Sequence, residues 1–224
     1  MEIDLDDIDP AAAAAFTQQH ATYGPGDGLR RTLGERRWQR ARVEFERLGL
    51  ELATLDRLEP WAVALLYSVS SLARLGFEPA LGVEEQLKTR ALADDKPIGG
   101  LETLEYQLGL FDALPPADQA RLLELTLDDT AGSLREADAL TRAWREGDER
   151  ALARLLLREY RRFPGLYEPL VHGRNRNWVP QVEALLRETD DTLLIVGAMH
   201  LVGERGLVAL LRERGLVVEP LRLH

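Results

Sequence analysis

A histidine follows an apolar run near the end of the chain. Residues 192–196 are mostly apolar and predict a buried strand, Gly197 follows them, and His200 comes three residues later. Open α/β folds place their sites beyond the carboxyl ends of such strands. A histidine in that position can serve as a metal ligand or as a general acid or base. The alternative is a connection between a strand and a helix in which His200 only hydrogen-bonds its neighbours.

Two glutamates could join this histidine. Glu2 lies in a short segment of alternating apolar and acidic residues, and Glu102 directly follows residues 97–101, which can form a short strand. Glu102 could bind a metal ion or act as a base, and the carboxylate of Glu2 must find a partner or stay in contact with water. The alternatives are an exposed chain end for Glu2 and, for Glu102, capping of the helix that begins near Thr103, by Thr103 or by a neighbouring carboxylate.

Residues 172–178 contain an unusual number of hydrogen-bond donors, with the sequence His-Gly-Arg-Asn-Arg-Asn-Trp. Arg174 or Arg176 could clamp a carboxylate, either one of the protein or one of a substrate. Asn175 could polarise a carbonyl group or hold a water molecule. The alternative is a loop followed by a helix whose N-cap is Asn175 or Asn177.

Composition limits the classes of function that the chain can have. Its 224 residues carry a net charge of −10, which argues against binding to a nucleic-acid backbone. The chain has no cysteine, so disulfides, thiolate zinc sites and cysteine nucleophiles are excluded. No segment matches HExxH, the P-loop, GxSxG or GxGxxG, so the mechanisms that depend on those motifs lack their signatures.

No apolar stretch approaches the roughly 20 residues that span a bilayer, and the acidic start of the chain does not resemble a secretory signal. We therefore expect a soluble protein with no membrane span. It is expected to be cytoplasmic if Met1 is the true start, and exported or membrane-anchored if further residues precede Met1.

The elements that must position these residues are mostly helical. Helices are predicted over residues 11–19, 29–48, 61–75, 82–93, 103–111, 116–145, 149–160, 176–188 and 204–214. Short strands are predicted from Met1 onward and over residues 97–101, 192–196 and 217–221. We therefore predict a helix-rich α/β fold in one domain over residues 1–224. Its small sheet would join short strands that are distant in sequence, with a helical insertion across about residues 110–168.

Four segments, in order, resemble the TraB/GumN family, which is similar to the Tiki-type metalloproteases. Residues 1–5 resemble the family's strand that carries a glutamate, and residues 96–107 resemble its K-P-v-x-g-L-E-T-x-x-x-Q block. Residues 174–177 resemble its RNxx segment, and residues 196–215 resemble its vGxxHLxGxxGxxxlLxxxG block. The resemblance covers almost the whole chain.

The resemblance implies a metal-dependent, peptidase-like hydrolase site built from two GxxH motifs, the strand glutamate and a basic/amide pair. Carried over by position, His200 is a metal ligand, and Glu2 is a ligand or the base. Arg174 and Asn175 hold substrate or the developing oxyanion. Glu102 matches a recurrent family position, where it would contact substrate. The implied cofactor is a divalent ion such as manganese, cobalt or zinc, and the implied partner is a peptide or small-molecule substrate.

The chain departs from the family pattern at the first GxxH motif, which in the family precedes the strand glutamate. No such histidine stands before Glu2 here. We therefore expect an incomplete site and weak or no metal binding by this chain alone. One alternative is a non-catalytic protein that binds or sequesters a peptide or small ligand, with Arg174 and Arg176 as a carboxylate clamp. Another is a structural member of the family with no active cleft.

Overall fold

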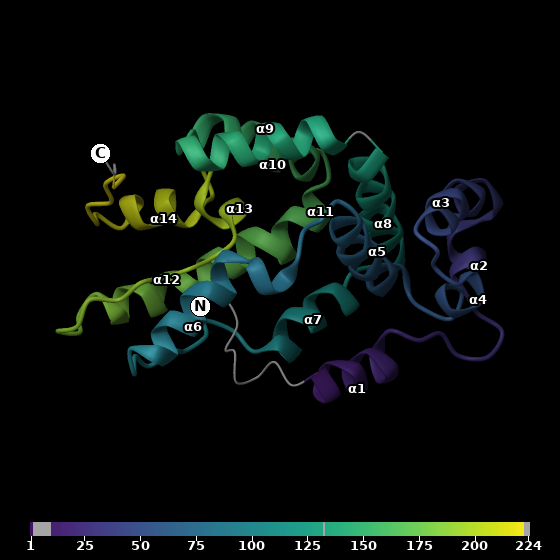
Figure 1. The fold of residues 1–224 in the computed structure, drawn as a ribbon, viewed down its shortest axis with the longest axis horizontal. Helices are drawn as coiled ribbons and strands as arrows, with labels where there is room; N and C mark the ends of the chain where they lie inside the picture. The colour runs from purple at the N-terminus through teal and green to yellow at the C-terminus, as the bar shows by residue number, and fades with distance from the viewer. Residues whose placement is uncertain (2–9, 132, 222–224) are drawn as a thin grey trace. The chain divides into compact units, whose positions relative to one another are not determined.

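The computed structural model describes Met1, residues 10–131 and residues 133–221 (Figure 1). These residues are mostly helical, which confirms the prediction of a helix-rich chain. The elements are α1 (Pro10–His20), α2 (Leu29–Leu33), α3 (Glu35–Arg47), α4 (Leu52–Leu55), α5 (Pro60–Arg74), the 3₁₀ turn η2 (Pro79–Leu81), α6 (Val83–Ala93), α7 (Leu104–Asp112), α8 (Pro116–Ala131), α9 (Ser133–Glu146), α10 (Glu149–Arg162), α11 (Pro164–Tyr167), the π-helical turn η3 (Glu168–His172), α12 (Gly173–Leu185), α13 (Ala198–Leu201) and α14 (Leu207–Glu213).

The predicted small sheet is not found in the described residues, where the one isolated bridge outside any strand joins Thr22 and Leu58. Residues 192–196 and 217–221 adopt no regular structure. An extended segment becomes a strand only when a neighbour pairs with its backbone groups. Residues 192–196 are also not deeply buried, since Leu193 is 70% exposed. Residues 192–196 therefore do not form the buried strand that their apolar composition predicted.

Residues 97–101 come closest to the predicted pairing. The amino group of Met1 donates to the carbonyl oxygen of Gly99 at 2.6 Å, and the amide of Leu101 donates to the carbonyl oxygen of Met1 at 3.0 Å. Two bonds of this kind around Gly100 follow the pattern of a parallel pair. The rest of the opening strand, Glu2 included, falls on residues 2–9, which lie outside the described residues.

The chain divides into two compact units, one ending at Ser133 and the other beginning at Leu134. Each unit has its own buried residues. The prediction of one domain with a helical insertion over residues 110–168 stays a prediction. None of the described helices is long and apolar enough to cross a membrane.

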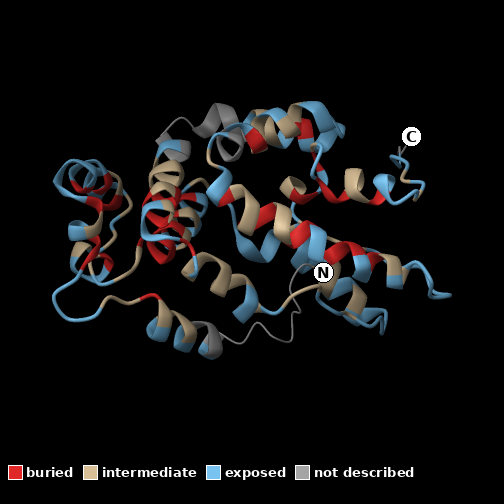
Figure 2. Ribbon diagram, turned by 180° about the vertical axis from the view of Figure 1, so that it is seen from behind, coloured by how far each residue is buried: buried red, intermediate tan, exposed pale blue. Residues whose placement is uncertain are grey.

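The first unit is built around α5, which packs against α8. Pro60 stands in the first turn of α5, where its missing N–H costs no hydrogen bond, and Gly76 follows the helix with a φ of +85°. Trp61 and Tyr67 of α5 are almost completely buried, and the Tyr67 ring meets Phe45 of α3 edge-on at 6.0 Å. Figure 2 shows buried residues where α5 and α8 meet. Each large side chain buried there contributes about 1.5–3 kcal/mol.

One of the two longest predicted helices is divided in the described residues. Residues 29–48 form α2 and α3, because Gly34 between them has a φ of +74°, which a continuing helix does not allow. Residues 116–145 are covered by α8 and α9, on either side of residue 132, which is not described. Helical periodicity predicted that both stretches are helical but did not predict the break at Gly34.

The second unit places α12 against α14, and α13 against both α10 and α14. Gly206, just before α14, approaches the preceding chain closely. A Cβ atom at this position would lie 2.6 Å from the carbonyl oxygens of both Leu201 and Val202. Only glycine allows this approach without a shift of the backbone.

We predict that Gly206→Ala lowers the free energy of unfolding by about 1–3 kcal/mol, because the new methyl group meets rigid backbone atoms. Urea unfolding followed by circular dichroism measures the change. Gly109→Ala is the control, since a Cβ atom there meets nothing within 4 Å and alanine favours the helix by up to about 1 kcal/mol. Equal stability of Gly206→Ala and the wild type would contradict this account of residue 206.

Candidate functional site

Three of the side chains predicted to carry chemistry lie together in the second unit. Nδ1 of His200, in α13, lies 2.7 Å from Oδ1 of Asn175, and Nε2 of His200 lies 3.2 Å from Nη1 of Arg174. Arg174 and Asn175 belong to the first turn of α12. The exposed fractions are 0% for Asn175, 5% for Arg174 and 6% for His200. We call these three residues, with Trp178, the His200 centre.

Short-range contacts hold the histidine and the asparagine in place. The amide of His200 donates to the carbonyl oxygen of Gly197 at 2.9 Å, which closes the tight turn that begins α13. The side-chain amide of Asn175 donates to the backbone carbonyl oxygen of Arg205 at 2.9 Å. That bond ties α12 to the segment between α13 and α14, where Gly206 permits the close approach. The centre therefore depends on both the helix and this segment.

The hydrogen bonds assign the protonation state of His200. Because the NH₂ group of Asn175 is used by the Arg205 carbonyl, its oxygen faces Nδ1, and Nδ1 must carry the hydrogen. Nε2 then holds a lone pair and accepts a hydrogen bond from the guanidinium of Arg174, which can only donate. The ring is thus assigned as a neutral imidazole with its basic nitrogen facing a permanent cation.

Trp178 forms an aromatic wall beside both side chains. Its ring centroid lies 4.5 Å from that of His200, and Cζ of Arg174 lies 5.0 Å from the ring centroid. The second contact is a cation–π interaction, which strengthens when the pair is removed from water. Trp178 is fully buried, and its Nε1 finds no hydrogen-bond partner among the described residues. Trp178 was not among the predicted site residues, although its i,i+4 spacing from Arg174 on a helix predicts the contact.

Arg176 clamps a carboxylate of the protein. Its Nη2 donates to Oε1 of Glu168 at 2.6 Å, and Nδ1 of His172 lies 2.7 Å from Oε2 of the same carboxylate. Nδ1 of His172 also lies 2.6 Å from Nη1 of Arg176, and one ring nitrogen cannot donate and accept at once. We assign the Nδ1 hydrogen of His172 to the bond with Glu168, because an ionised carboxylate can only accept hydrogen bonds. The bond from His172 and then that from Arg176 hold the pKa of Glu168 below its ordinary value.

The predicted N-cap at Asn175 or Asn177 is wrong. Residues 173–177 all lie inside α12, and the preceding π-helical turn η3 leads into this helix without a loop. Asn175 is therefore a buried helical residue whose side chain is used by His200 and by the Arg205 carbonyl. π-helical turns inside helical segments are frequent at functional sites.

The two candidate glutamates are not shown in this centre. Glu102 belongs to the first unit, just before α7, where the hydroxyl of Thr103 accepts a hydrogen bond from the amide of Tyr106 at 3.1 Å. The helix cap is therefore supplied by Thr103. Glu2 lies outside the described residues. Both keep their predicted roles only as predictions.

The described residues do not form a complete metal site. Among them, no group of three or more histidine, cysteine, aspartate or glutamate side chains could hold an ion. His200 fits as one ligand, because a metal-binding imidazole commonly donates its other N–H to a carbonyl or carboxylate group. Its Nε2, however, faces the positive guanidinium of Arg174 in this arrangement.

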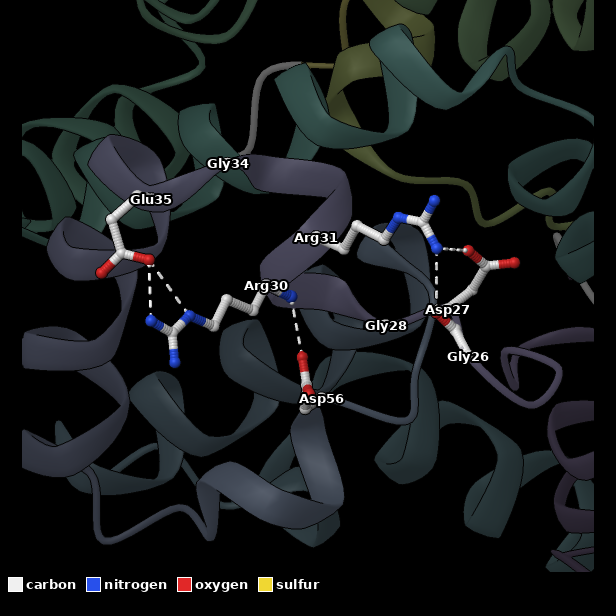
Figure 3. Close-up of a pocket in the computed structure, with 8 residues that line it drawn as sticks. All are labelled: Gly26, Asp27, Gly28, Arg30, Arg31, Gly34, Glu35 and Asp56. Carbon is white, nitrogen blue, oxygen red and sulfur yellow. Dashed lines mark hydrogen bonds and ion pairs between the residues drawn. The ribbon is translucent and has the colours of Figure 1, made fainter.

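A polar hollow of about 440 Å³ lies in the first unit (Figure 3). Its charged side chains form ion pairs with one another. Nη2 of Arg30 lies 2.9 Å from Oε2 of Glu35, and Nη1 of Arg31 lies 3.1 Å from Oδ1 of Asp27. The carboxylate of Asp56 accepts a hydrogen bond from the backbone amide of Arg30 at 2.7 Å. These contacts explain the hollow as exposed ion pairs around α2, and we assign no ligand to it. Glycines complete its lining: Gly26, Gly28 and Gly34.

Comparison with known proteins places the chain in a family. The model of the TraB/PrgY/gumN family matches residues 1–220. The chain belongs to this family. It is also similar to the uncharacterized protein YbaP of Escherichia coli (strain K12) and to that of Shigella flexneri. The identity to each is 25% over 186 residues, which cover 83% of this chain and 69% of the relative. No solved structure matches the chain.

The family match confirms the resemblance inferred from four sequence segments. His200, Arg174 and Asn175 come from two of those segments and meet in one buried cluster. The proteins that the comparison names add no activity or cofactor, so these remain matters for proposal.

We predict that Asn175→Ala lowers the free energy of unfolding by about 2–4 kcal/mol. The change removes this partner from the buried Nδ1 of His200 and from the partly buried Arg205 carbonyl, at up to about 1–3 kcal/mol each. Urea unfolding measures the loss, and Asn177→Ala, an exposed asparagine on the same helix, should stay within about 0.5 kcal/mol of the wild type. Equal effects of the two substitutions would contradict the assigned hydrogen bonds.

A pH dependence follows from the lowered pKa of Glu168. A carboxyl group whose pKa is lower in the folded state adds stability above its unfolded pKa of about 4.3 and loses it as the pH falls through its folded pKa. Between about pH 5 and pH 3 the wild type should therefore lose stability more steeply than Glu168→Gln. Unfolding midpoints measured across this range test the difference, and parallel curves would refute it.

Proposed function

We propose that the His200 centre is part of a metal-dependent, peptidase-like hydrolase site of the TraB family type. The observation that carries the proposal is the 2.7 Å bond between Nδ1 of His200 and Oδ1 of Asn175. It keeps the hydrogen on Nδ1 and the lone pair on Nε2, which is the arrangement found around metal-binding histidines. The backbone of Arg205 supports Asn175 in turn.

Each residue has a distinct role in this proposal. His200 and Glu2 would hold the divalent ion, which when bound lowers the pKa of a water molecule and polarises a carbonyl group. Asn175 orients the imidazole. Arg174 would donate N–H groups to a substrate carboxylate or to a developing oxyanion, and its burial strengthens such an interaction because water screens it less. Glu102 stays a proposed substrate contact.

Arg176 has a weaker claim to bind substrate. Its guanidinium is already paired with Glu168 at 2.6 Å, so a substrate carboxylate would have to compete with one that the protein supplies. A clamp of two arginines on one ligand would therefore require this ion pair to open.

Metal binding tests the role of His200. We expect calorimetric titration with manganese, cobalt and zinc to show weak binding by the wild type, with loss of that binding in His200→Ala. Asn175→Ala should lower the affinity by about 10- to 100-fold, the usual effect of removing a partner that orients a ligand. His20→Ala is the control, because His20 lies on α1 in the first unit. Unchanged binding by His200→Ala would overturn the proposal.

A non-catalytic binding protein is the second candidate. The observation that favours it is the guanidinium of Arg174 at Nε2 of His200, since a cation stands where the family-type ion would bind. In that case Arg174 and its neighbours would bind the carboxylate or carbonyl group of a peptide without cleaving it.

A random mixture of short dye-labelled peptides separates the two candidates. The binding protein is expected to retain peptides by fluorescence anisotropy, with the same affinity in His200→Ala, and mass spectrometry should detect no cleavage. Metal-dependent cleavage by the wild type that His200→Ala abolishes would instead support the hydrolase.

A further inference from the structure

We propose that Arg174 closes the metal-binding nitrogen of His200 in the metal-free protein and has to leave it before an ion can bind. The inference rests on the proposed function, because it concerns the same site. It adds that the arginine acts as an internal competitor of the metal ion as well as a contact for substrate.

The competition follows from the geometry of one lone pair. Nη1 of Arg174 lies 3.2 Å from Nε2 of His200. A zinc ion would stand about 2.0–2.1 Å from the same nitrogen. An imidazole nitrogen has one lone pair, so it can accept the hydrogen bond or bind the ion, but not both. An ion and a guanidinium at these distances would overlap and would also repel each other as like charges.

The closed position of Arg174 is built into the helix. Its Nη1 also donates to the carbonyl oxygen of Leu170, in the π-helical turn η3, at 3.3 Å. Its guanidinium lies over the ring of Trp178, four residues further along α12. The carbonyl, the aromatic ring and the imidazole all contact a cation that is 95% buried, so leaving this position means giving up at least these contacts.

The closed position also affects substrate binding. While Arg174 donates Nη1–H to His200 and Leu170, those hydrogens are not available to an oxyanion. Release of Nε2 makes the hydrogen that it accepted available to an oxyanion. Metal binding at His200 and carboxylate binding by Arg174 should therefore favour each other, since coupling between two ligands is reciprocal.

The test compares the metal affinity of the wild type, Arg174→Gln and Arg176→Gln by calorimetry with zinc and manganese. We expect Arg174→Gln to bind these ions at least about tenfold more tightly than the wild type. Glutamine places no positive charge beside Nε2 of His200. Arg176→Gln is the matched control on the same helix and should behave as the wild type. Circular dichroism checks that each variant is folded.

A measurement on the wild type keeps the test independent of how Arg174→Gln folds. In ¹⁵N-resolved NMR spectra of the metal-free protein, His200 should show hydrogen on Nδ1 and a hydrogen-bonded Nε2. Saturation with zinc should shift the side-chain N–H signal of Arg174.

The possible results distinguish a failure of this inference from a failure of the proposed function. Binding that His200→Ala abolishes, but that is equal in the wild type and Arg174→Gln, would overturn this inference and leave the proposed function standing. An Arg174 signal that does not move at zinc saturation would do the same. Failure of every variant to bind any of the ions would overturn the proposed function and this inference together.

Discussion

The lone pair on Nε2 of a buried histidine can serve only one partner, and the second unit is organised around that constraint. Asn175 takes the hydrogen of Nδ1 and so fixes which nitrogen carries the lone pair. Arg174 then meets that lone pair from the same helical turn. A buried polar cluster of this kind is stable only when its members satisfy one another, since an unpaired group in the interior costs about 1–3 kcal/mol.

Helix α12, the η3 turn and the segment before α14 each help to position the side chains around His200. Residues four apart on a helix share a face, which is why Arg174 and Trp178 of α12 lie together. The π-helical turn η3 provides the Leu170 carbonyl beneath the guanidinium. Gly206 lets the chain pass close to the end of α13, where the neighbouring Arg205 carbonyl meets Asn175. Loss of the η3 turn or of Gly206 would therefore disturb the imidazole through Arg174 or Asn175.

The sequence could predict the residue types of the centre but not all of its geometry. His200 could be identified from its spacing after Gly197, and Arg174 and Asn175 from the cluster of hydrogen-bond donors around them. Strand pairing depends on partners distant in the chain, so the apolar run at residues 192–196 misled the prediction of a sheet. The N-cap predicted at Asn175 or Asn177 was wrong because helical geometry continues through η3, where the local composition favours a loop. No local sequence pattern shows whether an apolar run finds a strand partner, or whether a helix continues through a segment whose composition favours a loop.

The magnitude of the Arg174 contact decides what kind of metal site could open it. A hydrogen bond that involves a charged group is worth about 1.5–3 kcal/mol, which corresponds to about a 10- to 150-fold loss of apparent metal affinity. A complete structural zinc site gains about 10–16 kcal/mol, so a full set of ligands would displace the arginine with little loss. The binding free energy of an ion held by a single imidazole is too small to offset this loss. The same contact therefore scarcely affects a site with all its ligands but governs one that has His200 alone.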